Sequence, residues 1–408
     1  MRVCVVGSGA REHALADVLG RTADSVVVTP GNAGIAESTA APAEEIDADL
    51  FVIGPEEPLV DGLADRLRAR GALVFGPGAD GARLEGSKAW MKAALAEAGV
   101  PTARHHAFEA SEVEEAVAYL RDLPGLYVVK TDGLAAGKGV FVTESLADAV
   151  EDLREKLSGA SFGDAGTTVV VEEGLSGPEL SLLCVCDGQK IAALAPAQDY
   201  KRVGDGDAGP NTGGMGAYSP VPFVDATLVE NIVDRIVAPT LQWLRKQGID
   251  YRGVLYAGLM LTPEGPKIIE YNVRFGDPEA EAVLPRMTSD LTSLLAEAAS
   301  GALRADPTFA EDAAVTVMCA SEGYPLSPRL GDVIHGLGEA ESVEGVRVYC
   351  AGVGRDGEGH LVTAGGRVLS VTAHGRDLNS ARSRAYESVG LLSWPGMVFR
   401  RDIGVAST

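Results

Sequence analysis

The chain has 408 residues, which is enough for two to four domains at roughly 150 residues per domain. Hydrophobic residues make up 46% of it and charged residues 23%, the composition of a globular protein with large buried cores. The 58 acidic residues outnumber the 35 Lys and Arg residues and leave a net charge of −23, so neither nucleic acid nor an anionic membrane is an expected partner.

The sequence gives no sign of export or of membrane insertion. Its first two residues lead directly into a strand pattern, unlike a signal peptide, and no apolar run reaches the ~18 residues of a membrane span. Cys184 and Cys186 share one face of an expected strand and the other cysteines are scattered, which favours buried reduced thiols over a disulfide or a metal site. We therefore expect a cytoplasmic protein.

Residues 1 to about 100 alternate between strand and helix patterns. Continuous apolar runs at 2–6, 26–29, 50–53 and 73–75 predict strands, and residues 59–70 predict a helix. Strands that are apolar on both faces are typical of parallel sheets covered by helices. We therefore expect a doubly wound α/β domain.

A Gly7-x-Gly9 turn follows the first strand, as in dinucleotide-binding folds. Two features oppose a dinucleotide: the third fingerprint glycine would fall at Glu12, and the second strand ends near Asn32 without an acidic residue for a ribose. We expect the turn to receive a smaller phosphate at a helix N-terminus, with Arg11 nearby. The strand ends at 30–32 and 54–58 are further candidate ligand contacts, with simple tight turns as the alternative.

A glycine- and lysine-rich hairpin is predicted at residues 127–142. Two strand patterns, 127–129 and 140–142, flank a loop that carries Lys130, Lys138 and three glycines. Glycine lets backbone N–H groups approach an anion, and the lysines add positive charge, so the loop suits nucleotide phosphates. It lacks the P-loop spacing, and an ordinary hairpin remains the alternative.

The region around the hairpin supplies further candidates. A helix is expected at 88–98 with Ser87 as its N-cap, and another at 151–157. A strand at 169–171 ends in Glu172 and Glu173, where backbone groups are suited to an adenine, and Glu179 begins the next strand, where it is suited to a ribose. The polar, glycine-dense segment 209–220 predicts a functional loop. A helix over 227–248 should kink or restart at Pro239.

Polar residues alternate along the strand that follows a turn at residues 263–265. Glu270 and Asn272 are two residues apart and so point to one face, and Arg274 continues that face. A carboxylate and an amide oxygen on one face suit Mg²⁺ that bridges phosphates. Such a row on an otherwise apolar strand is hard to explain by packing alone, because buried polar groups need partners.

Residues beyond about 313 predict a separate sheet. Short strands are expected at 314–320, 331–335, 346–349, 361–363 and 367–372, followed by a helix at 378–389. Glycine turns between these runs are typical of an antiparallel sheet. The sequence assigns this part no chemistry of its own.

The order of these motifs resembles the ATP-grasp ligases and, more closely, the phosphoribosylamine–glycine ligase (glycinamide ribonucleotide synthetase) family. The matching stretches are residues 7–13, 30–34, 54–56, 84–88, 132–139, 198–202, 209–219, 255–260 and 274–279. They are long, nearly literal and spread from the first strand to about residue 280. Many ATP-grasp enzymes carry a second acidic metal ligand on the preceding strand, roughly where Ala257 lies here, so only Glu270 and Asn272 are expected as protein ligands of the metal.

The resemblance implies an architecture and a reaction. The fold class is α/β and α+β multidomain: a Rossmann-like domain at 1–100, an ATP-grasp domain at 101–312 with a hinged lid at about 118–187, and a mixed β domain at 313–408 that completes the site near the substrate. The implied reaction joins glycine to 5-phosphoribosylamine in de novo purine synthesis, with ATP cleaved to ADP and phosphate. ATP and Mg²⁺ (or Mn²⁺) are the implied cofactors, and a monomer or weak homodimer is the implied assembly.

The resemblance also implies roles for individual residues. ATP phosphates are expected at Lys88, Lys130 and Lys138, and adenosine at Glu172, Glu173, Leu175 and Glu179. The metal is expected at Glu270 and Asn272. Phosphoribosylamine is expected at Gly9, Asn32, Gly54, Glu56, Asp199 and Lys201, and glycine and its acyl phosphate at Asp199, Gly214 and Arg274. The expected catalytic residues are Arg274, Asp199 and Lys138, with Arg286 and Arg367 as further contributors.

Two other functions remain open from the sequence. One is an ATP-grasp ligase for another carboxylate, such as formate or bicarbonate; the Pro-Asn-Thr-Gly-Gly-Met-Gly segment at 210–216 argues for glycine. The other is a non-catalytic nucleotide or dinucleotide sensor; Glu12 and the missing acidic strand end oppose NAD, and the Glu270 and Asn272 pair would be superfluous in a sensor.

Overall fold

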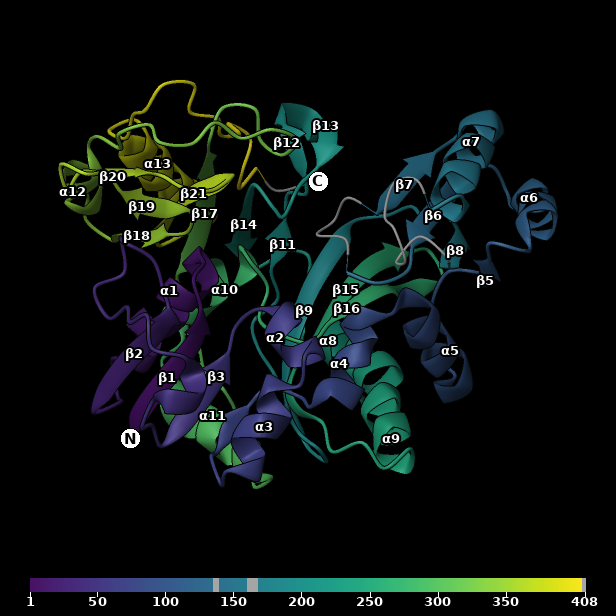
Figure 1. The fold of residues 1–408 in the computed structure, drawn as a ribbon, viewed down its shortest axis with the longest axis horizontal. Helices are drawn as coiled ribbons and strands as arrows, with labels where there is room; N and C mark the ends of the chain where they lie inside the picture. The colour runs from purple at the N-terminus through teal and green to yellow at the C-terminus, as the bar shows by residue number, and fades with distance from the viewer. Residues whose placement is uncertain (135–138, 160–167, 406–408) are drawn as a thin grey trace.

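The computed structural model describes residues 1–134, 139–159 and 168–405. Figure 1 shows the N-terminal and C-terminal parts stacked on one side, a small lobe on the other side, and a central sheet between them. None of the helices within the described ranges is both long and apolar enough to cross a membrane. All five cysteines are buried free thiols, as predicted.

The N-terminal part is built on a parallel sheet with strand order β2-β1-β3-β4, which confirms the expected α/β organisation. Its strands are β1 (Arg2–Gly7), β2 (Ser25–Pro30), β3 (Leu50–Ile53) and β4 (Val74–Phe75). Its helices are α1 (Ala10–Leu19), η1 (Ala43–Glu45), α2 (Glu56–Val60), α3 (Leu63–Ala69) and α4 (Ala79–Gly86). The single helix predicted over 59–70 is wrong: Gly62, with φ of +74°, breaks it into α2 and α3.

The small lobe, here called the hairpin subdomain, has an antiparallel sheet with order β5-β8-β6-β7. Its elements are β5 (His105–Glu109), α6 (Val113–Arg121), β6 (Tyr127–Thr131), β7 (Val140–Thr143), α7 (Leu146–Leu157) and β8 (Thr168–Glu173). Phe108, Leu120, Leu153 and Val171 belong to a hydrophobic core separate from the main one. The predicted hairpin is confirmed. The predicted helix at 151–157 begins earlier, where Ser145 caps α7.

The central sheet is antiparallel, with order β10-β9-β15-β16. Its strands are β9 (Glu179–Asp187), β10 (Ile191–Ala193), β15 (Arg252–Thr262) and β16 (Gly265–Asn272). The helices around it are α5 (Lys88–Ala98), α8 (Ala226–Ile232), η4 (Val233–Val237), α9 (Ala238–Lys246), α10 (Glu279–Val283), η5 (Leu284–Arg286) and α11 (Leu291–Ser300). The prediction for α5 and its Ser87 cap is confirmed, and Pro239 lies in the first turn of α9, as the expected restart requires.

The C-terminal sheet has the order β11-β14-β17-β21-β18, and all its pairs are antiparallel, as predicted. Its strands are β11 (Gln198–Asp199), β14 (Gly216–Ser219), β17 (Ala313–Ala320), β18 (Val346–Cys350) and β21 (Arg367–Gly375). The remaining elements are β12 (Arg202–Gly204), η3 (Asp205–Asp207), β13 (Ala208–Asn211), α12 (Leu337–Glu341), β19 (Val353–Arg355), β20 (Leu361–Thr363) and α13 (Leu378–Val389). Strands β11 and β14 thereby bring residues 198–219, which are rich in polar residues and glycine, to the β11 end of this sheet.

Two sequence predictions for this part are corrected. The segment 209–220 is not one long loop, because it contains β13 and β14. Residues 331–335 form no strand; single bridges join Val333 to Val362 and His335 to Ser393. Gly331 and Gly336 flank the segment with φ of +89° and +82°, and these left-handed turns bend the chain out of an extended course.

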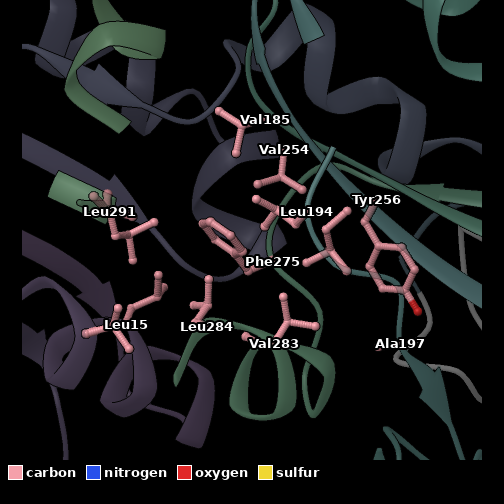
Figure 2. Close-up of a cluster of buried hydrophobic side chains, with 14 of the residues drawn as sticks. Leu15, Val185, Leu194, Ala197, Val254, Tyr256, Phe275, Val283, Leu284 and Leu291 are labelled. Atoms are coloured by element: carbon pink, nitrogen blue, oxygen red, sulfur yellow. The ribbon is translucent and has the colours of Figure 1, made fainter. Parts of the chain in front are cut away.

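One continuous core joins the N-terminal, central and C-terminal parts. Figure 2 shows Phe275 lying among Leu15 of α1, Val254 of β15 and Leu291 of α11. Phe275 is 1% exposed, and its burial holds the segment 274–279 where three parts of the chain meet. The polar residues on either side of Phe275 are fixed in position by this apolar anchor.

Candidate active site

Two cavities adjoin at the centre of the molecule. The larger, of about 650 Å³, lies between the hairpin subdomain and the central sheet. The smaller, of about 450 Å³, is lined by residues of the N-terminal part, α5, β16 and the C-terminal part. Both are lined by Val140, Asp199, Lys201, Thr212 and Glu270, so these residues mark a junction at which contents of the two cavities would touch.

The larger cavity combines apolar walls with a polar end. Val128 and Val142 of the hairpin face Met260 and Ile269 of the central sheet across it. Such walls suit a flat aromatic ring system. The predicted residues Lys130, Glu172, Glu173, Leu175 and Glu179 all line this cavity.

The carboxylate of Glu172 is bound by two lysines. Its Oε1 lies 2.9 Å from Nζ of Lys130, and its Oε2 accepts a hydrogen bond of 2.8 Å from Nζ of Lys92. Burial opposes ionisation, but the two ammonium groups outweigh it and hold the pKa of Glu172 below its ordinary value. The carboxylate of Glu172 is therefore occupied within the protein, and its backbone groups, the ones expected to meet an adenine, remain for a ligand.

Glu179 is likewise paired inside the protein. Nζ of Lys201 is in contact with the carboxylate of Glu179 and lies 3.3 Å from Oδ1 of Asp199. Burial raises the pKa of Asp199 to about 7; Lys201 opposes the rise, and Glu279 and Glu179 add to it. Asp199 therefore changes its charge near neutral pH at the junction of the two cavities.

Glu270 and Asn272 lie on one face of β16, as predicted. Within the described part of the chain the half-buried carboxylate of Glu270 has no hydrogen bond or ion pair, although it lines both cavities. Gly258 of β15 lies opposite Glu270, and Ala257 opposite Tyr271, so β15 offers no second carboxylate there. An unpaired carboxylate beside an amide oxygen fits a hard divalent cation.

Arg274 connects three parts of the smaller cavity. Its Nε donates to Glu56 of α2 at 3.1 Å, and its Nη2 donates to Glu85 of α4 at 2.7 Å and to Oδ1 of Asn272 at 3.1 Å. Burial raises the pKa of Glu85 to about 7 despite this neighbour. The predicted residues Arg274 and Glu56 are thus brought together. Glu85 received no role from the sequence, although it lies in the matching stretch 84–88.

Arg367 of β21, in the C-terminal sheet, contacts the glycine-dense segment 209–220. Its Nη1 donates to the carbonyl oxygens of Gly213 at 2.5 Å and Asp277 at 2.9 Å. The hydroxyl of Tyr324 accepts the N–H of Gly213 at 3.0 Å, a contact that sequence reasoning missed. Gly214, at φ of +109°, lines the smaller cavity, as do Arg367 and Asp277.

Lys88 also lines the smaller cavity and reaches across to the hairpin subdomain. Its Nζ donates to the carbonyl oxygen of Gly133 at 2.8 Å. Burial lowers the pKa of Lys88, while Glu270 opposes the fall. Lys138, predicted beside it, lies outside the described residues. Arg286 is buried at the C-terminal sheet, where it donates to Ser219 at 2.8 Å, and lines neither cavity.

Gly9, Asn32 and Gly54 do not line either cavity. The anion at the Gly7-x-Gly9 turn is the chain's own Glu12, whose Oε2 accepts the N–H of Gly9 at 2.6 Å and whose Oε1 accepts from Arg11 at 2.6 Å. A Cβ at Gly54 would lie 2.0 Å from Oε1 of Glu12, so this glycine makes room for the same carboxylate. The expected phosphate would have to displace Glu12 from the helix N-terminus.

Asn32 joins the N-terminal and C-terminal parts. Its Nδ2 donates to the carbonyl oxygens of Ser8 and Cys350, each at 2.9 Å, and its Oδ1 accepts from Gly34 at 2.8 Å. All the polar atoms of this side chain therefore have partners within the protein, and the structure gives it the position of a domain clamp.

The sequence matches the three domains of one family. Residues 1–85 match the N domain of phosphoribosylglycinamide synthetase, residues 86–280 its ATP-grasp (A) domain and residues 314–406 its C domain. A phosphoribosylamine–glycine ligase of Streptomyces coelicolor is 47% identical over 99% of this chain and 98% of the relative.

Solved structures agree with this assignment. The crystal structure of a phosphoribosylamine–glycine ligase from Thermotoga maritima has a TM-score of 0.88 at 35% identity and covers 98% of this chain and all of its own. The biotin carboxylase domain of a 2-oxoglutarate carboxylase from Hydrogenobacter thermophilus, at 15% identity, has a TM-score of 0.75 over 98% of this chain and 91% of that one, a likeness of fold. Three domain models of one family match this chain, and relatives align along nearly its whole length. This chain therefore belongs to the phosphoribosylglycinamide synthetase family.

Proposed function

We propose that this chain joins glycine to 5-phosphoribosylamine, with ATP cleaved to ADP and phosphate, as a cytoplasmic carbon–nitrogen ligase of de novo purine biosynthesis. The observation that carries the proposal is the meeting of two cavities at Glu270 and Asp199. A ligase that activates a carboxylate with ATP needs the terminal phosphate and the carboxylate in contact, away from water. Membership of the family supports the choice of both substrates.

The larger cavity takes ATP in this proposal. The adenosine lies between the hairpin strands and the central sheet, against the backbone of Glu172 and Glu173, with Leu175 and Glu179 at its edge. Lys130 and Lys88, which line the two cavities, bind the phosphates, and Lys138 is given the same role from its sequence motif alone. Mg²⁺ or Mn²⁺ held by Glu270 and Asn272 would neutralise phosphate charge and orient the terminal phosphoryl group.

The smaller cavity takes glycine and phosphoribosylamine. Asp199, half of it ionised near pH 7, faces the ammonium group of glycine, and Arg274 faces its carboxylate. Gly214 borders the acyl group, and Glu56 and Lys201 border the sugar phosphate. Because Gly9, Asn32 and Gly54 lie outside this cavity, their part in substrate binding is indirect, through the turns that position Glu12 and the C-terminal sheet.

The reaction then needs no protein nucleophile. A carboxylate oxygen of glycine attacks the terminal phosphorus of ATP and ADP leaves, which gives glycyl phosphate. The amine nitrogen of phosphoribosylamine attacks the acyl carbon, phosphate leaves, and the nitrogen loses a proton, for which Asp199 is the acceptor at the junction. Both steps depend on positioning and on charge stabilisation.

The hairpin subdomain moves as a lid over ATP in this proposal. Its separate hydrophobic core supports a body that can rotate as a unit. The lid implied by the resemblance was 118–187; its described residues up to Glu173 belong to the hairpin subdomain, whereas β9 belongs to the central sheet. An ATP analogue should protect the hairpin subdomain from limited proteolysis. Unchanged cleavage would contradict closure.

The test of the function is phosphate release from ATP with Mg²⁺, with glycine and freshly made phosphoribosylamine each present or omitted. The proposal predicts release only with both substrates, and its loss in Glu270→Ala but not in Glu264→Ala, which removes an exposed carboxylate from the β15–β16 turn. Release that needs formate or bicarbonate instead of glycine would indicate another ATP-grasp ligase. No release with any mixture would indicate a binding protein.

A further inference from the structure

Lys92 is a buried charged residue to which the proposed mechanism gives no role. Its side chain is 1% exposed and lines neither cavity. It lies one helical turn after Lys88 on α5, so both point to the same side of the helix, toward the hairpin subdomain. Burying an ammonium group is costly, so its retention calls for a specific partner.

The partner is the carboxylate that also binds Lys130. Nζ of Lys92 donates to Oε2 of Glu172 at 2.8 Å, and Nζ of Lys130 lies 2.9 Å from Oε1 of the same residue. Of these three residues, Lys130 and Glu172 line the larger cavity, whereas Lys92 does not and lies behind them. Two ammonium groups thus share one carboxylate, and the Lys92–Glu172–Lys130 cluster has a net charge of +1.

The charge balance decides what Lys130 can offer a ligand. A buried Lys130–Glu172 pair alone would be neutral and would present a nucleotide phosphate with as much repulsion as attraction. With Lys92 on the far side, the carboxylate is satisfied from behind, and one unit of positive charge is left facing the cavity. This matters in a chain of net charge −23, whose overall field repels a polyphosphate. Burial lowers the pKa of Lys92 to about 8, which leaves it largely protonated at neutral pH.

The cluster is also tied to the strand that carries Glu270. Nζ of Lys92 donates to Oγ1 of Thr102 at 2.8 Å, and that hydroxyl donates to the carbonyl oxygen of Ile268 at 2.7 Å. Nζ of Lys130 reaches the carbonyl oxygen of Ile269 at 3.5 Å. Lys92 therefore fixes Lys130 relative to β16 as well as balancing its charge.

We propose that Lys92 is a positioning residue of the nucleotide site: it takes up the charge of Glu172 from behind, so that the Lys130 ammonium remains available to the phosphates of the nucleotide. The inference rests on the proposed function in one respect only, that the larger cavity binds a nucleotide. It assigns Lys92 an electrostatic role, acting through Glu172 and Lys130, rather than a contact with ATP.

The experiment measures binding of ADP with Mg²⁺ by isothermal titration to the full chain and three variants. Lys92→Met should weaken binding about tenfold or more, because the cluster falls from +1 to neutral. The double variant Lys92→Met/Glu172→Gln returns the cluster to +1 and should recover most of the lost affinity. Lys156→Met removes a buried lysine that is paired with Asp152 on α7 and does not line the cavity, and it should leave affinity unchanged.

Thermal unfolding of each variant separates charge from packing. If Lys92 only supports the fold, the double variant will bind no better than Lys92→Met, and the inference is overturned; equal affinity of Lys92→Met and the parent chain overturns it as well. The double variant also covers the case in which Lys92→Met does not fold, because its affinity should then lie near that of the parent chain. Failure of the parent chain to bind ADP would overturn the nucleotide site itself, whereas binding without the predicted pattern would overturn only the role of Lys92.

Discussion

Oδ1 of Asp132, in the hairpin subdomain, accepts the backbone N–H of Ala89 at 3.1 Å in the first turn of α5. Its Oδ2 accepts the hydroxyl of Ser87 at 3.0 Å, so one carboxylate caps a helix of the neighbouring part of the chain. The next residue, Gly133, accepts from Lys88. Asp132 and Gly133, which follow strand β6, are therefore docked on the helix that carries Lys88 and Lys92.

Asp132→Ala should weaken nucleotide binding several-fold, because a cap of this kind is worth about 1 kcal/mol and here it also aligns the hairpin loop. Titration with ADP and Mg²⁺ measures the effect. Asp225→Ala is the matched control, since Asp225 caps α8 by accepting the N–H of Leu228 and lines neither cavity. Equal affinity of the two variants would show that the Asp132 contact does not bear on the site.

The ligase rate should rise with pH through about 7. Burial raises the pKa of Asp199 to about 7, so the folded protein holds this carboxyl protonated below that pH and ionised above it. Binding of the glycine ammonium and acceptance of the amine proton both need the ionised form, so kcat/KM for glycine increases from pH 6 to 8.

Asp199→Asn should lower the rate about a hundredfold and remove this rise. Glu85 has a pKa raised to about 7 in the same cavity, and Glu85→Gln tells the two groups apart. If the rate of Asp199→Asn still rises with pH and the rate of Glu85→Gln does not, the titrating group is Glu85. That result would contradict the role given to Asp199.

Gly214→Ala should abolish turnover, because a Cβ there would lie 2.4 Å from Cδ of Pro278 and its φ is +109°. The clash displaces the segment held by Arg367 and narrows the smaller cavity. Gly206→Ala is the control: it also has positive φ, +64°, but a Cβ meets nothing within 4 Å. Steady-state rates of the two variants measure the difference, and similar activity would mean that the segment can shift without harm.

Asn32→Ala should reduce the free energy of unfolding by about 2 kcal/mol, since it removes three hydrogen bonds within the protein. Urea unfolding measures this, with the exposed Asn231→Ala as control. A clamp role predicts that KM for phosphoribosylamine changes little once the variant is folded. A large rise in that KM at unchanged stability would return Asn32 to the substrate site.

Local sequence signals were sufficient for much of the fold. The helix α5 begins after its N-cap, Ser87, and ends before Gly99, whose φ is +69°. Serine before a helix and glycine after it are recognisable signals in the sequence alone. Alternation along β16 placed Glu270 and Asn272 on one face without knowledge of the neighbouring strand. The missed break at Gly62 shows the limit, because a glycine is compatible with a helix until the tertiary structure selects its left-handed conformation.

The candidate site was harder to predict, since the sequence lists charges but not their partners. Glu172 and Glu179 were both expected at adenosine, yet the carboxylate of each is paired with a lysine of the chain itself. The partners come from distant positions: Lys92 lies 80 residues before Glu172. Tyr324 and Glu85 were missed for the same reason, because only the packed domains bring them to the segments they hold.

The most direct test of the account is the fate of the glycine carboxylate oxygens. Glycine labelled with ¹⁸O in both carboxylate oxygens is turned over with ATP, Mg²⁺ and phosphoribosylamine, and the released phosphate is analysed by mass spectrometry. We expect one ¹⁸O atom in each phosphate, because a carboxylate oxygen forms the bond to phosphorus and leaves with it. Phosphate without the label, at a normal rate of product formation, would contradict the glycyl phosphate intermediate. It would also contradict the proposal that ATP and glycine meet where the two cavities join.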